Sequence, residues 1–181
     1  MKRRAVFIDR DGVLNRAVVR DGRPHPPARV DDVEILPGVP ESLRALKAAG
    51  FVLIVVSNQP DVARGTTARA TVEAINARLA ERLPVDRFIM CCHDTGDGCD
   101  CRKPRPGMLL AGAREFDVDL SASFMVGDRW RDIEAGAAAG CKTVFIDYGY
   151  DEQRPRACDY RVLSAEEAFT AILEGMRHAT D

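Results

Sequence analysis

The chain has 181 residues, which favours a single domain, and its 46% hydrophobic content is ample for a packed core and excludes a disordered chain. Its 26 Lys and Arg residues against 28 Asp and Glu residues give a formal net charge of -2, without the basic excess expected of a nucleic-acid-binding protein. The longest aliphatic-aromatic run, 51–56, is too short to cross a bilayer, and the run 5–8 is too short for a signal peptide. We therefore expect a soluble, cytoplasmic protein without a nucleic-acid or membrane partner.

Apolar runs of strand length alternate along the chain with amphipathic helical stretches, a pattern typical of an α/β domain with a mainly parallel sheet. In chain order, we predict a strand at 5–8, a proline-rich loop without regular structure at 16–27, a helix at 39–46, a strand at 51–56, a helix at 72–83, a strand at 87–90, a helix at 106–116, a strand at 123–126, a helix at 133–139, a strand at 143–146 and a helix that a capping box opens at 164–167.

Two carboxylates, Asp9 and Asp11, directly follow the first predicted strand, and Gly12 comes next. In open parallel sheets, active sites gather beyond the carboxyl ends of the strands. One carboxylate can attack as a nucleophile while the other donates or accepts a proton, and Mg²⁺ can screen both charges. A polar turn is the alternative reading of this motif alone, because Asp and Gly are common in turns.

Further polar residues occur at or near the ends of other predicted strands: Ser57 and Asn58, Lys103, and Asp128 followed by Asp132. A hydroxyl, a lysine and further carboxylates can therefore converge on Asp9 and Asp11 at one edge of the sheet. Phosphoryl transfer requires such groups, namely a nucleophile, carboxylates that hold a metal ion, and donors to the equatorial oxygens.

The segment 91–101 holds four of the six cysteines: Cys91, Cys92, Cys99 and Cys101. With His93, the pairs Cys91-x-His93 and Cys99-x-Cys101 supply three thiolates and one imidazole, the closed tetrahedral set typical of structural zinc. We prefer Cys91 to the adjacent Cys92 because Cys91 completes the Cys-x-His pair. The alternative is a set of reduced cysteines beside a surface histidine. Zinc at this position would stiffen the loop and would have no catalytic role.

The motifs at these strand ends resemble those of the haloacid dehalogenase superfamily of phosphatases, which are Asp-x-Asp-Gly, Ser or Thr, Lys, and Gly-Asp-x-x-x-Asp. They occur here, in the same order, as 9–12, Ser57, Lys103 and 127–132. The resemblance implies a Rossmann-like three-layer α/β sandwich. Because no sizeable insertion follows the first motif or the second strand, we expect no separate cap domain, and one phosphatase domain over 1–181.

The same resemblance implies a mechanism. Asp9 would attack phosphorus to form an aspartyl-phosphate, and Asp11 would protonate the leaving oxygen and then activate water. Asp9, the backbone carbonyl of Asp11, and Asp128 would hold Mg²⁺, while Ser57 and Lys103 would bind the transferring phosphoryl group. The role of Asp132 is left open between support of the metal site and a cap on the following helix.

The cysteine loop and the segment 102–108 resemble the subgroup of D,D-heptose 1,7-bisphosphate phosphatases and their histidinol-phosphatase relatives. This resemblance implies that Arg102 contacts the distal part of a phosphorylated sugar substrate and that Asn58, Gln59 and Pro60 line its pocket. The expected reaction converts D-glycero-D-manno-heptose 1,7-bisphosphate to heptose 1-phosphate. Histidinol phosphate or another small phosphomonoester, a phosphomutase reaction, and a non-catalytic binding module are the alternatives.

Two departures from the subgroup bear on substrate choice. Pro60 and Asp61 stand where the subgroup usually has Ser-Gly, so a backbone donor is lost and a negative charge is added. The cysteine loop is also shorter than is usual among the heptose enzymes. Arg64 is left open between an anion-binding and a solvated side chain. We expect a monomer, with an oligomer as the alternative.

Overall fold

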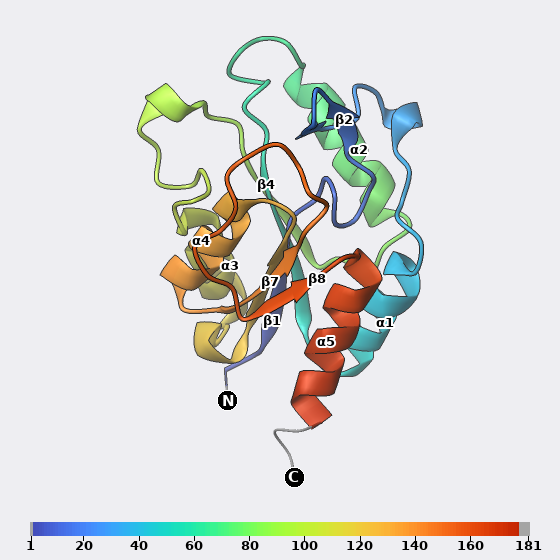
Figure 1. Cartoon of the computed structure of the whole chain (residues 1–181), viewed down its shortest axis with the longest axis vertical. Helices are drawn as coiled ribbons and strands as arrows, with labels where there is room; N and C mark the ends of the chain where they lie inside the picture. The colour runs from blue at the N-terminus through green and yellow to red at the C-terminus, as the bar shows by residue number, and fades with distance from the viewer. Residues whose placement is uncertain (1, 178–181) are drawn as a thin grey trace.

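A computed structural model describes residues 2–177 of the chain, so the ends of the expected domain, residue 1 and residues 178–181, lie outside the described residues. Its centre is a six-stranded sheet (Figure 1). From edge to edge, the strands are β5 (Arg87–Cys91), β4 (Val52–Asn58), β1 (Ala5–Ile8), β6 (Phe124–Gly127), β7 (Lys142–Ile146) and β8 (Tyr160–Val162). All neighbouring strands in this sheet are parallel. The prediction of an α/β fold with a mainly parallel sheet is therefore confirmed.

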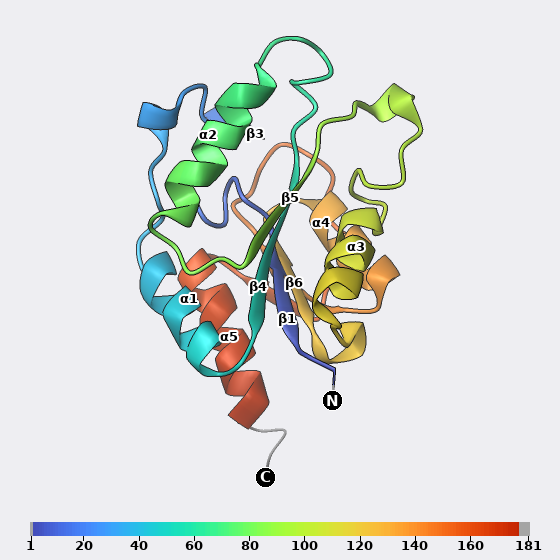
Figure 2. The same cartoon turned by 180° about the vertical axis from the view of Figure 1, so that it is seen from behind.

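Helices cover both faces of this sheet and make a three-layer sandwich (Figure 2). One face carries α1 (Val39–Ala48), α2 (Arg69–Ala80) and α5 (Ala165–Arg177), and the other carries α3 (Gly107–Phe116) and α4 (Trp130–Ala139). Three short 3₁₀ helices lie in the connections: η1 (Val30–Asp32), η2 (Thr95–Asp97) and η3 (Leu120–Ala122). Among the described residues, no helix is both long enough and apolar enough to span a membrane.

Each face of the sheet has its own hydrophobic core, because successive side chains of a strand point to opposite faces. In β1, Val6 and Ile8 pack with residues of α1 and α5, whereas Ala5 and Phe7 pack with residues of α3. The central strands are buried on both faces, which explains why their sequences are continuous apolar runs without alternation.

The segment 16–27, predicted to lack regular structure, contains an antiparallel hairpin of β2 (Val18–Arg20) and β3 (Arg23–His25). Its turn is Asp21-Gly22, where both residues have positive φ angles, 49° and 71°, as a type I′ turn requires. Pro24 lies next to the pair of residues that flanks the turn, at a position whose N–H does not point to the partner strand. The prediction is wrong because a proline at such a position removes no hydrogen bond from the ladder.

The sequence pattern also does not predict strand β8. It has three residues, and its alternating partial exposure gives no apolar run to recognise. The sequence predicts that the strands leading to the polar motifs end at the same side of the sheet. The structure agrees, since β1, β4, β5 and β6 are parallel and bring their carboxyl ends to one side of the molecule.

Candidate active site

A cavity of about 350 Å³ lies at the carboxyl edge of the sheet. Residues of the predicted motifs line it: Asp9, Asp11, Ser57, Asn58, Pro60, Arg102, Lys103 and Asp132. Basic residues make up much of the remaining wall: Arg23, His25, Arg64, Arg129 and Arg131. The structure therefore brings together residues that lie as much as 123 positions apart in the sequence, from Asp9 to Asp132, in a basic cavity.

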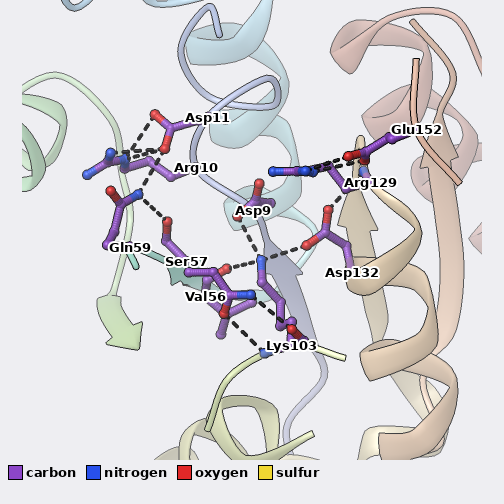
Figure 3. A network of polar contacts seen from close by, with 11 residues as sticks. Asp9, Arg10, Asp11, Val56, Ser57, Gln59, Lys103, Arg129, Asp132 and Glu152 are labelled. Atoms are coloured by element: carbon purple, nitrogen blue, oxygen red, sulfur yellow. Dashed lines mark hydrogen bonds and ion pairs between the residues drawn. The ribbon is translucent and has the colours of Figure 1, made fainter. Parts of the chain in front are cut away.

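Lys103 is the centre of the polar network at the floor of this cavity (Figure 3). Its Nζ donates to Asp9 Oδ1 at 2.7 Å and to the carbonyl of Val56 at 2.6 Å, and it forms an ion pair with Asp132 Oδ1 at 2.7 Å. Burial opposes the charge of Lys103, but the carboxylates of Asp132 and Asp9 outweigh it and raise the pKa of the lysine to about 12. Lys103 is therefore a fixed cation beside Asp9.

At Asp9, burial and the neighbouring carboxylates outweigh the positive charge of Lys103. Burial raises the pKa of Asp9 from 3.8 to about 6, and the nearby Asp132 and Asp11 act in the same direction, although the ion pair with Lys103 lowers it. Since a carboxylate attacks phosphorus only when it is ionised, additional positive charge at this site would favour the reactive form.

Asp11 is held on the other side of the cavity, with its carboxylate turned away from Asp9 (Figure 3). Arg10 Nη2 and Gln59 Nε2 each donate to Asp11 Oδ2 at 2.9 Å, and Asn15 Nδ2 donates to Oδ1 at 3.0 Å. Asp9 and Asp11 thus occupy separate environments, one beside a lysine and the other beside an arginine.

The loop after β4 is placed by its own side chains. Asn58 accepts a hydrogen bond from the backbone N–H of Lys103 and donates one to its carbonyl, both at 3.0 Å. Gln59 does not line the cavity, contrary to the expectation for it: the side chain is buried, and its Nε2 donates to Ser57 Oγ at 2.9 Å as well as to Asp11. Gln59 therefore supports the wall from behind, because a buried amide must find partners within the protein.

Asp128 is the group that points most directly to a metal ion. Both of its carboxylate oxygens are buried, and no donor among the described side chains meets full hydrogen-bond geometry with them, although the Tyr150 hydroxyl lies close enough to lower the pKa of Asp128. Carboxylate oxygens of Asp9, Asp128 and Asp132 lie within 4.8 Å of one another. Burial and the charges of Asp9 and Asp132 raise the pKa of Asp128 well above its usual value. Buried oxygen ligands in need of a positive charge fit a hard divalent cation such as Mg²⁺.

Glycine is required beside this carboxylate. Gly12 has a φ angle of 88°, and a Cβ atom at this position would lie 1.9 Å from Asp128 Oδ2. The last residue of the first motif is therefore glycine for two reasons, its left-handed backbone and the close approach of Asp128.

Asp132 both caps a helix and pairs with the lysine. Its Oδ2 accepts a hydrogen bond from the backbone N–H of Arg129 at 3.0 Å at the start of α4, while its Oδ1 pairs with Lys103. Of the two roles left open by the sequence, the cap is present, and a place in the carboxylate cluster with Asp9 and Asp128 is compatible with the other; the ion pair with Lys103 is an additional role.

The loop after β5 gathers the predicted zinc ligands. Cys91 Sγ lies 3.6 Å from His93 Nδ1, 3.7 Å from Cys99 Sγ and 3.1 Å from Cys101 Sγ. The four ligand atoms lie within 4.8 Å of one another, and Cys92 does not belong to the set. Burial raises the pKa of the Cys91 thiol, so a bound cation would be needed to keep this thiolate ionised. The cluster fits a tetrahedral metal site.

This cysteine loop is tied to the neighbouring walls of the cavity. Arg64 forms a two-point ion pair with Asp94, with Nε–Oδ2 and Nη2–Oδ1 distances of 2.6 and 2.8 Å. Arg102 donates to the carbonyl of His93 at 3.1 Å. Arg64 is thus paired with a carboxylate while it lines the cavity, and its loop is linked to the cysteine loop.

Other residues at the site were not found from the sequence. Arg10 is completely buried and contacts Asp11, although in a linear motif it is only the variable residue between two aspartates. Arg129 pairs with Glu152, which comes from a distant loop. Arg131 stacks on Trp130, with its Cζ 4.6 Å from the ring centroid, and has no ion-pair partner within residues 2–177. The one signal in the sequence is the presence of basic residues within the first and fourth motifs, 9–12 and 127–132.

Comparisons with known proteins agree with this geometry. A sequence model of the haloacid dehalogenase-like hydrolase family matches residues 26–140. The D-glycero-beta-D-manno-heptose-1,7-bisphosphate 7-phosphatase of Pasteurella multocida (strain Pm70) is 39% identical to this chain over an alignment of 189 positions, gaps included, that covers 97% of this chain and 99% of that protein. The protein of the same name from Pseudomonas aeruginosa is 37% identical over 154 residues, which cover 82% of this chain and 84% of that protein.

A solved structure is similar over the same extent. The crystal structure of a D,D-heptose 1,7-bisphosphate phosphatase from B. bronchiseptica, complexed with magnesium and phosphate, gives a TM-score of 0.77 at 31% identity and covers 95% of this chain and 99% of that chain. The family model matches more than half of the sequence, and the Pasteurella relative extends the similarity to nearly all of it. The chain therefore belongs to the haloacid dehalogenase-like hydrolase family.

Proposed function

We propose that this chain is a Mg²⁺-dependent phosphatase that removes the 7-phosphate of D-glycero-β-D-manno-heptose 1,7-bisphosphate and leaves heptose 1-phosphate. The observation that carries the proposal is the buried arrangement of Asp9, Lys103 and Asp132 at the floor of a basic cavity, next to the unpartnered carboxylate of Asp128. The substrate is taken from relatives that carry this activity in their names at 37–39% identity over most of the chain.

The proposed reaction has two steps. Asp9 attacks phosphorus, so that a bond forms between its carboxylate oxygen and phosphorus while the bond to the sugar oxygen breaks; Asp11 gives its proton to that oxygen. Asp11 then takes a proton from a water molecule that attacks the aspartyl-phosphate, which releases phosphate and regenerates Asp9. Ser57 and Lys103 bind the phosphoryl oxygens, and Lys103 at the same time fixes Asp9.

Two metal ions belong to this proposal. Asp9, the backbone carbonyl of Asp11, and Asp128 would hold Mg²⁺, which supplies positive charge to the nucleophile and to the phosphoryl oxygens. The set of Cys91, His93, Cys99 and Cys101 would hold Zn²⁺. Because all four of these side chains are ligands, the zinc site is closed, and its role is to fix the loop that leads to Arg102.

The rest of the substrate lies toward the basic wall of the cavity. Arg102, which lines the cavity, would contact the distal part of the sugar, and Asn58 and Pro60, which also line the cavity, would form part of the sugar's pocket. Gln59 acts through Ser57 and Asp11, with which it forms hydrogen bonds. Several cationic side chains around one cavity favour a substrate with more than one negative group.

The proposal also covers the whole molecule. Residues 2–177 belong to one domain, since a single sheet joins the first motif to β8. The protein belongs to a reducing compartment such as the cytoplasm, because its zinc ligands must remain thiols or thiolates; all six cysteines are free in the structure. In this proposal the protein acts as a monomer.

The test is phosphate release in the presence of Mg²⁺ from both anomers of the heptose bisphosphate and from histidinol phosphate, at matched low concentrations. A preference of a hundredfold or more in kcat/KM for the β-heptose, which corresponds to about 2.7 kcal/mol of transition-state binding, is expected. A preference for histidinol phosphate in kcat/KM would contradict the proposal that the heptose bisphosphate is the substrate. Asp9→Asn is expected to abolish turnover while secondary structure and zinc content remain unchanged, and appreciable activity of this variant would exclude Asp9 as the nucleophile.

A further inference from the structure

Arg10 is unusual because a charged side chain of its size is completely buried. It does not line the cavity. Its Nη2 donates to Asp11 Oδ2 at 2.9 Å, and its Nε lies 3.2 and 3.3 Å from the two oxygens of the same carboxylate. The guanidinium thus faces Asp11 with two of its nitrogen atoms, the arrangement that fixes the plane of a carboxylate as well as its position.

The third nitrogen of the guanidinium is fixed by helix α2. Arg10 Nη1 donates to Asn76 Oδ1 at 2.9 Å. Asn76 is buried on the face of α2 that also carries Ile75 and Leu79, and its own Nδ2 donates to Met90 Sδ of β5 at 2.7 Å. A buried amide on an apolar helix face requires an explanation, and this contact with Arg10 provides it.

A buried cation is tolerated only where an anion and hydrogen-bond acceptors surround it. Asp11 supplies the charge and Asn76 supplies the remaining acceptor, so the three side chains form one unit that joins the sheet edge to α2. Gln59 and Asn15 complete the hold on the Asp11 carboxylate. Proton transfer depends steeply on such geometry, because the acid must lie within hydrogen-bond reach of the leaving oxygen.

We propose that Arg10, itself fixed by Asn76, is a positioning residue that orients the Asp11 carboxyl group, which carries the proton in this step, for transfer of that proton to the leaving oxygen of the substrate. The inference rests on the proposed phosphatase reaction and adds two residues to it, neither of which touches the substrate. Loss of the contacts that Arg10 makes with Asp11 and Asn76 slows the step that needs a proton from Asp11. It leaves phosphoryl transfer intact for a substrate whose leaving group departs without a proton.

The test compares leaving groups. We would measure kcat/KM of the wild type, Asn76→Leu and Arg10→Lys with the sugar phosphate and with p-nitrophenyl phosphate, whose phenolate leaves unprotonated. Because kcat/KM reports only the steps through the first irreversible one, the later activation of water by Asp11 does not enter it. General acid catalysis contributes roughly 10²–10⁴-fold, so a loss of about 30-fold or more is expected with the sugar phosphate, against less than about threefold with the aryl phosphate.

Met90→Leu is the matched control. It removes the other hydrogen-bond partner of Asn76 and leaves the contact between Asn76 and Arg10 in place, so both activities should change equally and little. Asn76→Leu is the main variant because it alters no charge, and thermal unfolding would verify that it folds. Equal losses on both substrates in a folded Asn76→Leu protein would show a merely structural role and overturn the inference. Failure of the wild type to hydrolyse either substrate would instead overturn the proposed function itself.

Discussion

The buried carboxylate of Asp128 is a local source of instability unless a cation lies beside it. The only donor near its oxygens among the described side chains is the neutral Tyr150 hydroxyl, short of full hydrogen-bond geometry, and Asp9 and Asp132 add negative charge nearby. An unpaired charge in a protein interior costs several kcal/mol, or the group remains protonated. The free energy of unfolding should therefore depend on Mg²⁺, and Asp128 should be required for that dependence.

We predict that Mg²⁺ raises the melting temperature of the wild type by several degrees relative to protein in EDTA, since about 1 kcal/mol shifts the midpoint of a domain of this size by about 2–4 °C. Asp128→Asn should raise the melting temperature in EDTA, because a buried charge is removed, and should abolish the response to Mg²⁺. Asp31→Asn, at an exposed aspartate, is the control and should respond like the wild type. An unchanged response of Asp128→Asn would contradict the assignment of Asp128 as a ligand.

At the same scale, the sequence indicates the reacting groups better than their supports. Asp9, Ser57 and Asp128 could be found because each lies at the end of a strand, and Lys103 because it matches a motif of the resembled family. Arg10 and Asn76 could not, since the burial of an arginine follows from the packing of α2 against the sheet edge and is invisible in the linear motif.

Among the structural elements, the cysteine loop has the clearest separable role. Arg64 holds it through Asp94, and Arg102 donates to the carbonyl of His93, so its conformation determines where Arg102 lies. Lys103 is fixed independently by Asn58 and by the carboxylates at the cavity floor. Removal of zinc should therefore disturb substrate binding more than the chemical step.

We predict that Cys99→Ser loses stoichiometric zinc and raises KM for the heptose bisphosphate by about tenfold or more, with a smaller change in kcat. Cys92→Ser, which changes the cysteine outside the ligand set, should keep zinc and wild-type kinetics. Zinc would be quantified in freshly purified protein beside steady-state kinetics. A variant Cys99→Ser whose kcat falls while KM stays constant would assign the loop a role in the chemical step instead.

The elements that the sequence indicates are those with strong periodicity. The buried parallel strands and the helices of both faces follow from apolar runs and helical spacing. The proline-rich segment 16–27 indicates irregular structure and so hides the β2–β3 hairpin, although the Asp21-Gly22 turn is itself a hairpin signal. Whether a proline interrupts a ladder depends on the register, which a sequence pattern does not fix.

For the molecule as a whole, the distribution of charge matters more than its sum. The formal net charge is only -2, yet the cationic side chains that line the cavity (Arg23, Arg64, Arg102, Lys103, Arg129 and Arg131) outnumber its carboxylates (Asp9, Asp11, Asp61 and Asp132). Arg64 and Arg129 are paired with carboxylates, whereas Arg131 has no such partner within residues 2–177. A concave basic surface of this kind attracts anionic substrates over a distance of about one Debye length.

We predict that kcat/KM falls more steeply with ionic strength for the bisphosphate than for a monophosphate of the same sugar. Arg131→Ala should lower kcat/KM for the bisphosphate by about tenfold and make the two salt dependences more similar. Arg114→Ala, which removes an exposed arginine of α3 outside the cavity, is the control for net charge and should leave both unchanged. Equal salt dependences in the wild type would refute a steering role for the basic wall.

The arrangement of the cavity separates two sets of residues. The groups assigned to the chemistry lie at the edge of a rigid, doubly covered sheet, whereas the β2–β3 hairpin, the loop after β4 and the cysteine loop extend beyond that edge (Figure 1). Each of these three segments is a local excursion of the chain whose exchange leaves the sheet intact. In evolutionary terms, a new substrate requires only that these segments diverge, so an ancestral scaffold of this kind is able to yield enzymes of different specificity without inventing its reaction again.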